Sequence, residues 1–313
     1  MAIPVIDFSK INGSAEERAK TLAQIANGCE EWGFFQLENH GIPEELMERV
    51  KKVASECFKQ EREDMFNNSA LVKSFNDLVE GKNKGGKVED ADWEDVFTLL
   101  ADNEWPAINT PGFKETMAEY RAELKKLAEK LMEVMDHNLG LPIGTIKNAF
   151  NGEDEAFFGT KVSHYPPCPR PELVNGLRAH TDAGGVILLF QDDEVGGLQI
   201  LKDGHWIDVQ PMRNTIVINT GDQIEVLSNG RYKSTWHRVL ASSEGNRRSI
   251  ASFYNPSLKA TIAPAAELVK EAAAAAAADA SYPRFLFGDY MSVYSEQKFL
   301  PKEPRFEAVR AAV

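Results

Sequence analysis

The amino-terminal half of the chain carries apolar residues at helical spacing. Positions three to four residues apart are apolar in three segments, which is typical of amphipathic helices packed on a core. The first segment follows a capping-box pattern at Ser14 and Glu17, the second starts after Pro43, and the third covers about 113–139 before Gly140. Their apolar stripes are Leu22, Ile25, Ala26, Cys29 and Trp32, then Leu46, Val50, Val53 and Cys57, then Met117, Tyr120, Leu124, Leu127, Leu131 and Val134.

From about residue 161 the pattern changes to short segments with the character of strands. A fully apolar run covers 186–190, and Asp203-Gly204 has the composition of a hairpin turn. Further strands are predicted at 33–37, 198–201, 206–209, 215–219 and 250–254. Many short strands after a helical half indicate an α+β fold, mainly β, in which helices support a β-sandwich or barrel.

The same change of pattern suggests three regions within one compact unit. We predict a helical and strand region over 1–155, a β core over 156–260, and a helical tail over 261–313. The Gly- and Lys-rich stretch at 81–90 is expected to form a surface loop, and the alanine run from Ala272 to Ala278 favours helix.

Composition narrows the class of protein. The 313 residues carry a net charge of -13, which argues against nucleic acid or an anionic membrane as the main partner. The three cysteines, Cys29, Cys57 and Cys168, are sparse and have no paired spacing, so they resemble neither a disulfide framework nor a zinc cluster. With no apolar run long enough for a membrane span and no signal-peptide pattern at the start, a cytoplasmic protein is expected.

The residues with the clearest chemistry are His180-Thr181-Asp182. In an extended segment, positions two apart point to the same side, so this imidazole and carboxylate converge. Among the other histidines we favour His237 as a third ligand, because it lies beside a strand-like stretch in the β region. Two histidines and one carboxylate are typical of Fe(II) oxygenases, although a zinc hydrolase or an ordinary hydrogen-bonded surface pair also fits the pattern.

A second pattern is Arg247-Arg248-Ser249, directly before a predicted strand. In extended backbone Arg247 and Ser249 point the same way, and a guanidinium beside a hydroxyl is a good receptor for a carboxylate or bicarbonate. The alternative is a polar strand edge that faces water.

Taken in order, these motifs resemble the plant Fe(II)/2-oxoglutarate-type dioxygenases over nearly the whole chain. The resemblance rests on His180-Thr181-Asp182, His237 and Arg247-x-Ser249, and on the runs Pro4-Val5-Ile6-Asp7, Trp32-Gly33-Phe34-Phe35, Asn39-His40-Gly41-Ile42 and Tyr165-Pro166-Pro167-Cys168-Pro169. It implies a double-stranded β-helix, or jelly roll, as the core at 156–260, with a helical amino-terminal part and carboxyl-terminal helices. The His, Asp and His side chains are then expected to bind Fe(II).

A narrower resemblance is to the 1-aminocyclopropane-1-carboxylate oxidases. It rests on 176–185, 188–193, Gly159-Thr160-Lys161-Val162-Ser163, Asp92-Trp93-Glu94 and 302–308. It implies that 1-aminocyclopropane-1-carboxylate and O2 give ethylene, cyanide and CO2, with ascorbate as co-substrate and bicarbonate or CO2 as activator. This family does not use 2-oxoglutarate, and a monomer is expected.

The resemblance also implies roles for further residues. Catalytic or binding roles fall on Lys161, Arg178, Arg247 and Ser249, with Tyr165, Gln191 and Phe253 as additional parts of the substrate wall. The tail residues Lys302, Glu303, Arg305 and Glu307 are expected to support activity. Two other interpretations stay open: a 2-oxoglutarate-dependent hydroxylase of a plant hormone or secondary metabolite, and a jelly-roll binding protein without turnover.

Overall fold

The computed structural model of the chain describes residues 1–82, 91–101, 104–105, 109–151, 155–274 and 282–310. Most of the expected surface loop at 81–90, and the second half of the alanine run, lie outside the described residues. No helix among the described residues is long and apolar enough to cross a membrane.

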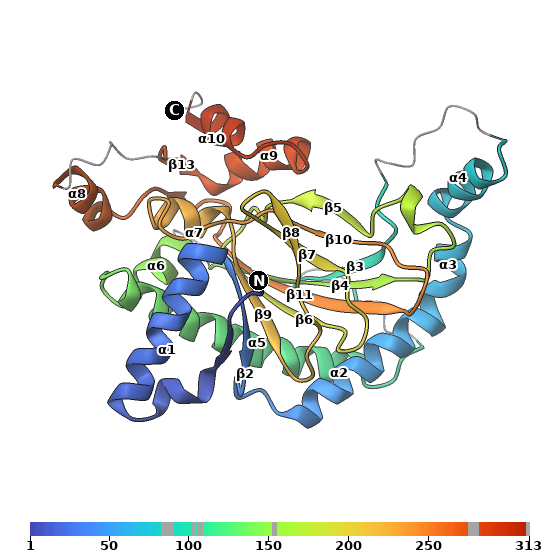
Figure 1. Cartoon of the computed structure of the whole chain (residues 1–313), viewed down its shortest axis with the longest axis horizontal. Coiled ribbons are helices and arrows are strands. Elements are labelled where there is room, and N and C mark those ends of the chain that lie inside the picture. The colour runs from blue at the N-terminus through green and yellow to red at the C-terminus, as the bar shows by residue number, and fades with distance from the viewer. Residues whose placement is uncertain (83–90, 102–103, 106–108, 152–154, 275–281, 311–313) are drawn as a thin grey trace.

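Two β-sheets form the centre of the molecule, as the predicted jelly roll requires (Figure 1). The larger sheet has seven strands in the order β1 (Val5–Asp7), β2 (Phe34–Glu38), β9 (Ile216–Thr220), β6 (Val186–Gln191), β11 (Arg247–Asn255), β4 (Phe157–Tyr165) and β3 (Asp95–Leu99). The smaller sheet has four strands in the order β5 (Leu177–His180), β10 (His237–Val239), β7 (Leu198–Lys202) and β8 (His205–Asp208). A separate short pair joins β12 (Thr261–Ile262) to β13 (Phe285–Leu286).

Helices of the amino-terminal half cover the outer side of the larger sheet (Figure 1). They are α1 (Ala15–Asn27), α2 (Glu44–Cys57) and α5 (Phe113–Asn138), which match the three predicted helices. The Ser14–Glu17 capping box is present, and Tyr120 of α5 packs its ring against Phe190 of β6. The other helices are α3 (Glu63–Asn67), α4 (Ala70–Val79), α6 (Thr145–Asn151), α7 (Asp222–Leu227), α8 (Ala266–Ala274), α9 (Phe287–Gln297) and α10 (Glu303–Arg310).

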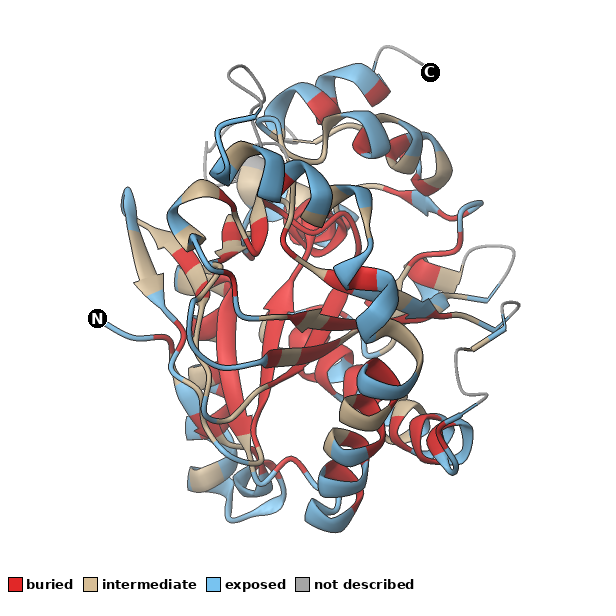
Figure 2. Cartoon of the chain, turned by 90° about the vertical axis from the view of Figure 1, so that its right-hand side faces the viewer, coloured by how far each residue is buried: buried red, intermediate tan, exposed pale blue. Residues whose placement is uncertain are grey.

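Burial follows this layering (Figure 2). The main core lies between the larger sheet and its helices, and it joins β6 and β9 to α2 and α5. A smaller core between the two sheets includes Phe34, Ile200 and Val217. The space between the sheets is only partly filled by this second core, so it can hold a cavity.

Some elements were not predicted. Strands β1 and β3 lie in the half that reads as helical, because each has only three to five residues and β3 is an edge strand with exposed positions. Strand β4 starts at Phe157, earlier than the expected change near residue 161. The predicted hairpin is confirmed, since Asp203 and Gly204 both have positive φ between β7 and β8.

Candidate metal centre

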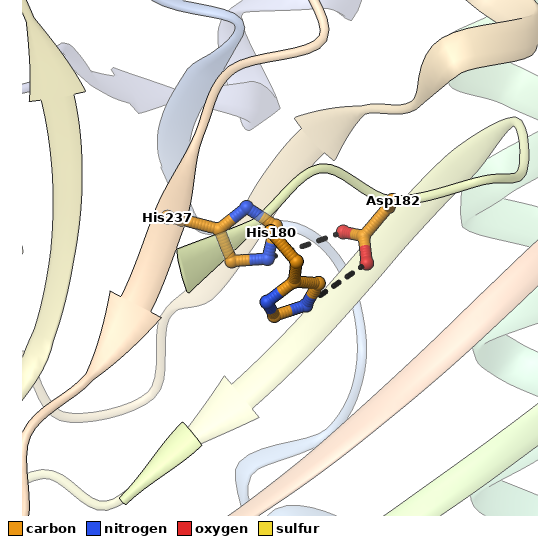
Figure 3. Close-up of side chains that lie close together, drawn as sticks. All are labelled: His180, Asp182 and His237. Carbon is orange, nitrogen blue, oxygen red and sulfur yellow. Dashed lines mark ion pairs between the residues drawn. The ribbon is translucent and has the colours of Figure 1, made fainter. Parts of the chain in front are cut away.

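The three proposed ligands come together at one point between the sheets. His180 ends β5, His237 begins β10, and the two residues are direct partners in the antiparallel pair. The His180 Nε2 lies 3.6 Å from Asp182 Oδ1, and the His237 Nε2 lies 3.4 Å from Asp182 Oδ2. Figure 3 shows both rings and the carboxylate directed toward one another. All three side chains are buried, and their ligand atoms lie within 4.8 Å of one another.

Backbone carbonyls fix the tautomer of both rings. The Nδ1 of His180 is 2.8 Å from the carbonyl oxygen of Arg178, and the Nδ1 of His237 is 3.0 Å from that of Thr235. A carbonyl can only accept, so each Nδ1 carries the proton and each Nε2 keeps its lone pair facing the centre. Burial lowers the pKa of His180 well below its ordinary value, which favours this neutral form. Neutral imidazoles aimed at a carboxylate are the form that binds a metal.

Asp182 lies in a loop, and contacts of this loop rather than strand pairing fix its position. Convergence of His180 and Asp182 by strand alternation requires extended backbone through 180–182, but β5 ends at His180. Beyond that point the loop is held by the amino-terminal end of α7: the Asp222 N–H donates to the Asp182 carbonyl at 2.8 Å, and the Gly221 N–H donates to the Gly185 carbonyl at 2.7 Å. Asn219 of β9 donates from Nδ2 to Asp182 Oδ2 at 2.8 Å and orients the carboxylate. The expected convergence is present, but its physical cause is different.

The centre opens on a cavity of about 250 Å³. The polar residues that line it, besides the three ligands, are Lys161, Ser163, Tyr165, Asn219, Arg247, Ser249, Asn255, Tyr294 and Lys298. Phe253 lines the same cavity, as expected for an apolar part of its wall. The wall is therefore rich in cations and hydroxyls, and it faces a site that needs an anionic ligand to balance a metal.

The predicted receptor pair occupies one face of β11. Arg247 is 3% exposed and Ser249 is 5% exposed, so the alternative of a water-facing strand edge is excluded. One guanidinium nitrogen lies 3.5 Å from the Ser249 hydroxyl, and the other donates to Gln191 Oε1 at 3.2 Å. Gln191 is absent from the described cavity lining, so its contact with this receptor is the hydrogen bond that it accepts from the guanidinium. The Nε of Arg247 is buried without a partner among the described residues, which leaves a donor for a bound anion.

Two carboxylates with no individual role expected from the sequence form ion pairs with the other predicted cations, Lys161 and Arg178. Glu94 accepts from Lys161 Nζ at 2.9 Å and from the Tyr165 hydroxyl at 2.7 Å. Asp92 pairs with Arg178, whose Nε lies 3.1 Å from Oδ1. The guanidinium of Arg178 also stacks on the ring of Phe299 at 3.8 Å and is outside the described lining of the cavity. From the sequence, Asp92-Trp93-Glu94 is only a family motif, because its contacts depend on the pairing of β3 with β4.

The carboxyl-terminal helices reach the ligand loop. Arg305 is completely buried, donates to the Thr181 hydroxyl at 3.0 Å and pairs with Asp222 at 3.2 Å. Tyr294 donates its hydroxyl proton to the Thr181 carbonyl at 2.8 Å. Lys302 pairs with the buried carboxylate of Glu225 at 2.7 Å, whereas the side chains of Glu303 and Glu307 are exposed on α10.

These residues fit a bound Fe(II). A set of two neutral imidazoles and one carboxylate, with a hydrogen-bonded carboxylate and carbonyl-bonded rings, is the donor chemistry of mononuclear Fe(II) sites with open positions. The cavity supplies room for ligands at those positions.

Comparison with known proteins agrees with this assignment. The sequence profile of the 2OG-Fe(II) oxygenase superfamily matches residues 157–256, and that of the non-haem dioxygenase in morphine synthesis N-terminal region matches residues 3–118. The chain is similar to 1-aminocyclopropane-1-carboxylate oxidase from Musa acuminata, with 70% identity over 99% of this chain and 100% of that protein. It is 69% identical to 1-aminocyclopropane-1-carboxylate oxidase 5 from Arabidopsis thaliana over 99% of this chain and 100% of the relative.

Solved structures show the same architecture. The structure of JOX2 in complex with 2OG, Fe and JA aligns with a TM-score of 0.78 and 32% identity, over 99% of this chain and 89% of that one. The dioxygenase for auxin oxidation 1 from Arabidopsis thaliana, in its binary complex with 2-oxoglutarate, aligns with a TM-score of 0.66 and 26% identity, over 85% and 97%. The jelly roll and its buried donor set define a non-haem iron oxidoreductase of the 2OG-Fe(II) oxygenase superfamily. Within that superfamily the chain belongs to the 1-aminocyclopropane-1-carboxylate oxidases.

Proposed function

We propose that this protein converts 1-aminocyclopropane-1-carboxylate and O2 to ethylene, cyanide and CO2. Ascorbate supplies two electrons and two protons and becomes dehydroascorbate, so that both oxygen atoms of O2 leave as water. Bicarbonate or CO2 acts as activator. The observation that carries the proposal is that one cavity joins the buried three-donor set to Lys161, Arg247 and Ser249. The high identity to oxidases of this name supports the choice of substrate.

In this proposal His180, Asp182 and His237 hold Fe(II) through Nε2, a carboxylate oxygen and Nε2. When bound there, Fe(II) supplies the activation of O2 and the oxidation of the amino acid. Asn219 keeps one carboxylate oxygen of Asp182 in place, and the carbonyls of Arg178 and Thr235 hold the two rings. The protein thus contributes two neutral imidazoles and a carboxylate, which these hydrogen bonds hold in place.

The cationic wall orients the small anions of the reaction. Arg247 and Ser249 are already placed to bind a carboxylate or bicarbonate, and Lys161 and Lys298 add positive charge on the same cavity. Phe253 and the other apolar residues exclude water from the cyclopropane ring. Arg178, held by Asp92, acts on this wall from outside the cavity lining. The tail supports activity through Arg305 and Lys302, which brace the segment that carries the ligands.

We further expect a monomeric protein of the cytoplasm. Cys29, Cys57 and Cys168 are buried and form no disulfide in the described part of the chain, which suits a reducing compartment.

Headspace gas chromatography tests the function. Purified protein receives Fe(II), ascorbate, bicarbonate and 1-aminocyclopropane-1-carboxylate, without 2-oxoglutarate. Ethylene that requires iron and ascorbate is the expected result. If folded, iron-loaded protein forms no ethylene but consumes O2 when 2-oxoglutarate is added, the 2-oxoglutarate-dependent hydroxylase becomes the better assignment.

A further inference from the structure

Glu94 lies directly behind two residues of the iron-cavity wall, Lys161 and Tyr165. Its side chain is 6% exposed, and it comes directly before β3 at the edge of the larger sheet. Both carboxylate oxygens are 2.9 Å from Lys161 Nζ, so the ammonium is bound by the whole carboxylate. The negative charge of a buried carboxylate next to an anion-binding cavity weakens anion binding. We therefore asked which anions Glu94 disfavours.

Glu94 also determines which hydrogen-bond donors of the wall remain free. The Tyr165 hydroxyl has one proton, and it is donated to Glu94 Oε1 at 2.7 Å. A second anion beside that hydroxyl would meet oxygen lone pairs instead of a donor. The Tyr165 ring in turn lies against the Arg247 guanidinium, with 5.1 Å between the guanidinium carbon and the ring centroid. The carboxylate is therefore linked through one side chain to the receptor at Arg247 and Ser249.

JOX2 and the dioxygenase for auxin oxidation 1 have both been solved with 2-oxoglutarate bound, a dianion that carries a second carboxylate. In this chain the Arg247–Ser249 receptor is intact and buried, so its presence does not explain a preference for other anions. Glu94 does supply an explanation, because it reduces the positive charge and the donor count next to that receptor.

We propose that Glu94 is a specificity-determining residue of this cavity: it disfavours 2-oxoglutarate and leaves the wall suited to singly charged anions such as bicarbonate or an amino-acid carboxylate. This proposal refines the proposed function, and it rests on that function for the identity of the favoured anions. Glu94 acts through Lys161 and Tyr165 and is not among the described residues that line the cavity, so it is a positioning residue and a local charge.

The test is a direct binding measurement without turnover. Fe(II)-loaded protein is titrated with 2-oxoglutarate under anaerobic conditions by calorimetry. Glu94→Gln keeps the shape but removes the charge, and we expect it to bind 2-oxoglutarate about tenfold or more tightly than the wild type. Glu94→Asp keeps the charge and should bind it as weakly as the wild type. Affinities of the wild type and Glu94→Gln within about twofold of each other would overturn the proposal.

Asp95→Asn is the matched control. Asp95 is the next residue, is also buried and pairs with Arg62 at 2.6 Å, away from the cavity lining. We expect this variant to melt at a lower temperature while its affinity for 2-oxoglutarate changes by no more than about twofold. A tenfold gain in Asp95→Asn as well would assign the effect to loosened packing and contradict a specific role of Glu94.

Glu94→Ala keeps the proposal testable if Glu94→Gln does not fold. Because it also removes the charge, it should bind 2-oxoglutarate about tenfold or more tightly than the wild type, and an affinity within about twofold of the wild type would refute the proposal. Ethylene formation is measured in parallel on the wild type. Failure to form ethylene together with a Glu94-dependent gain in binding would reject the proposed function and retain the role of Glu94.

Discussion

His237 lies directly opposite His180 in the antiparallel pair of β10 with β5, and their ring centroids are 4.3 Å apart. The metal centre is thus a property of strand register. Because side chains alternate along a strand, a slip of one residue in β10 would turn the imidazole of His237 to the other face. The ladder of β10 with β7, which pairs His237 with Ile200, holds the same register from the second side. Three strands of the smaller sheet therefore fix two ligands.

Asn219 is expected to set the affinity of the centre for metal. Its amide holds one oxygen of Asp182 at 2.8 Å, and loss of such an outer partner typically weakens metal binding about 10–100-fold. Asn219→Ala should show a loss of that size in a competition titration with a chelator, with Asp182→Ala as the variant that no longer binds. Gln199→Ala, which alters an amide on β7 away from the cavity, should bind like the wild type. Equal affinity for Asn219→Ala and Gln199→Ala would show that Asn219 has no such role.

Gly221 is required for close contact between two turns. A Cβ at this position would lie 2.4 Å from the Gly184 carbonyl oxygen and 3.0 Å from that of Asp182. Backbone atoms cannot rotate away, so Gly221→Ala should displace the ligand loop and cost about 1–3 kcal/mol of stability. Thermal unfolding and metal titration should both show the defect. Gly196→Ala is the matched control, because the nearest atoms to a Cβ there belong to Pro211, at 3.7 and 3.8 Å.

Arg305 should matter more for stability than any exposed arginine of the tail. It forms a fully buried pair with Asp222, and removal of one partner leaves a buried charge that costs about 3–5 kcal/mol. Arg305→Met should lower the urea midpoint by a corresponding amount and reduce ethylene formation. Arg310→Met removes an exposed charge from the same helix and should change neither. If both variants unfold at the same urea concentration, the buried pair does not stabilise the fold.

The buried environment of His40 predicts that the folded protein loses stability in mild acid. Its Nδ1 accepts from the Ile42 N–H at 3.2 Å, and its Nε2 lies 3.1 Å from the Asn214 carbonyl oxygen, so only one neutral tautomer satisfies both contacts. Burial lowers the pKa of His40 below its ordinary value of 6.5. The unfolded chain therefore takes up the proton first, and stability is complete above pH 6.5 and is lost as pH falls toward the lower folded pKa.

Melting temperatures between about pH 7 and pH 5 measure this effect. We expect the decline on acidification to be shallower in His40→Gln than in the wild type, although the variant starts from a lower value. His205→Gln alters an exposed histidine and should decline as the wild type does. A decline in His40→Gln as steep as in the wild type would assign the acid sensitivity to other groups.

Much of the fold could be predicted because its signals are local. The stripe from Met117 to Val134 specifies α5, and Asp203-Gly204 specifies the β7–β8 hairpin through backbone preferences alone. Strand β3 could not be predicted in this way. Its burial alternates only weakly, and it forms because β4 offers an unpaired edge. Pairing with a distant strand leaves little trace in the residues of an edge.

The same contrast between local and long-range signals applies to the residues of the candidate site. Residue types and spacing made His180, Asp182 and His237 candidate ligands, since few side chains can bind iron, and the family resemblance was needed to choose iron over zinc or an ordinary hydrogen-bonded pair. The roles of Glu94 and Asn219 could not be read from the sequence, because each depends on a hydrogen bond to a residue 71 or 37 positions away. An acid or an amide next to a strand has many ordinary uses, and only the fold shows which of them applies.

The contact of Arg305 with Thr181 spans 124 residues of sequence, and it has a consequence for biosynthesis. A chain grows from its amino terminus, so the strands with both histidines emerge from the ribosome before α10 exists. Until α10 docks, Thr181 and Asp222 lack the guanidinium that joins them, and the loop with Asp182 has its weakest support. Maturation of the iron centre is therefore tied to the last stage of folding, and partly made chains should carry little metal.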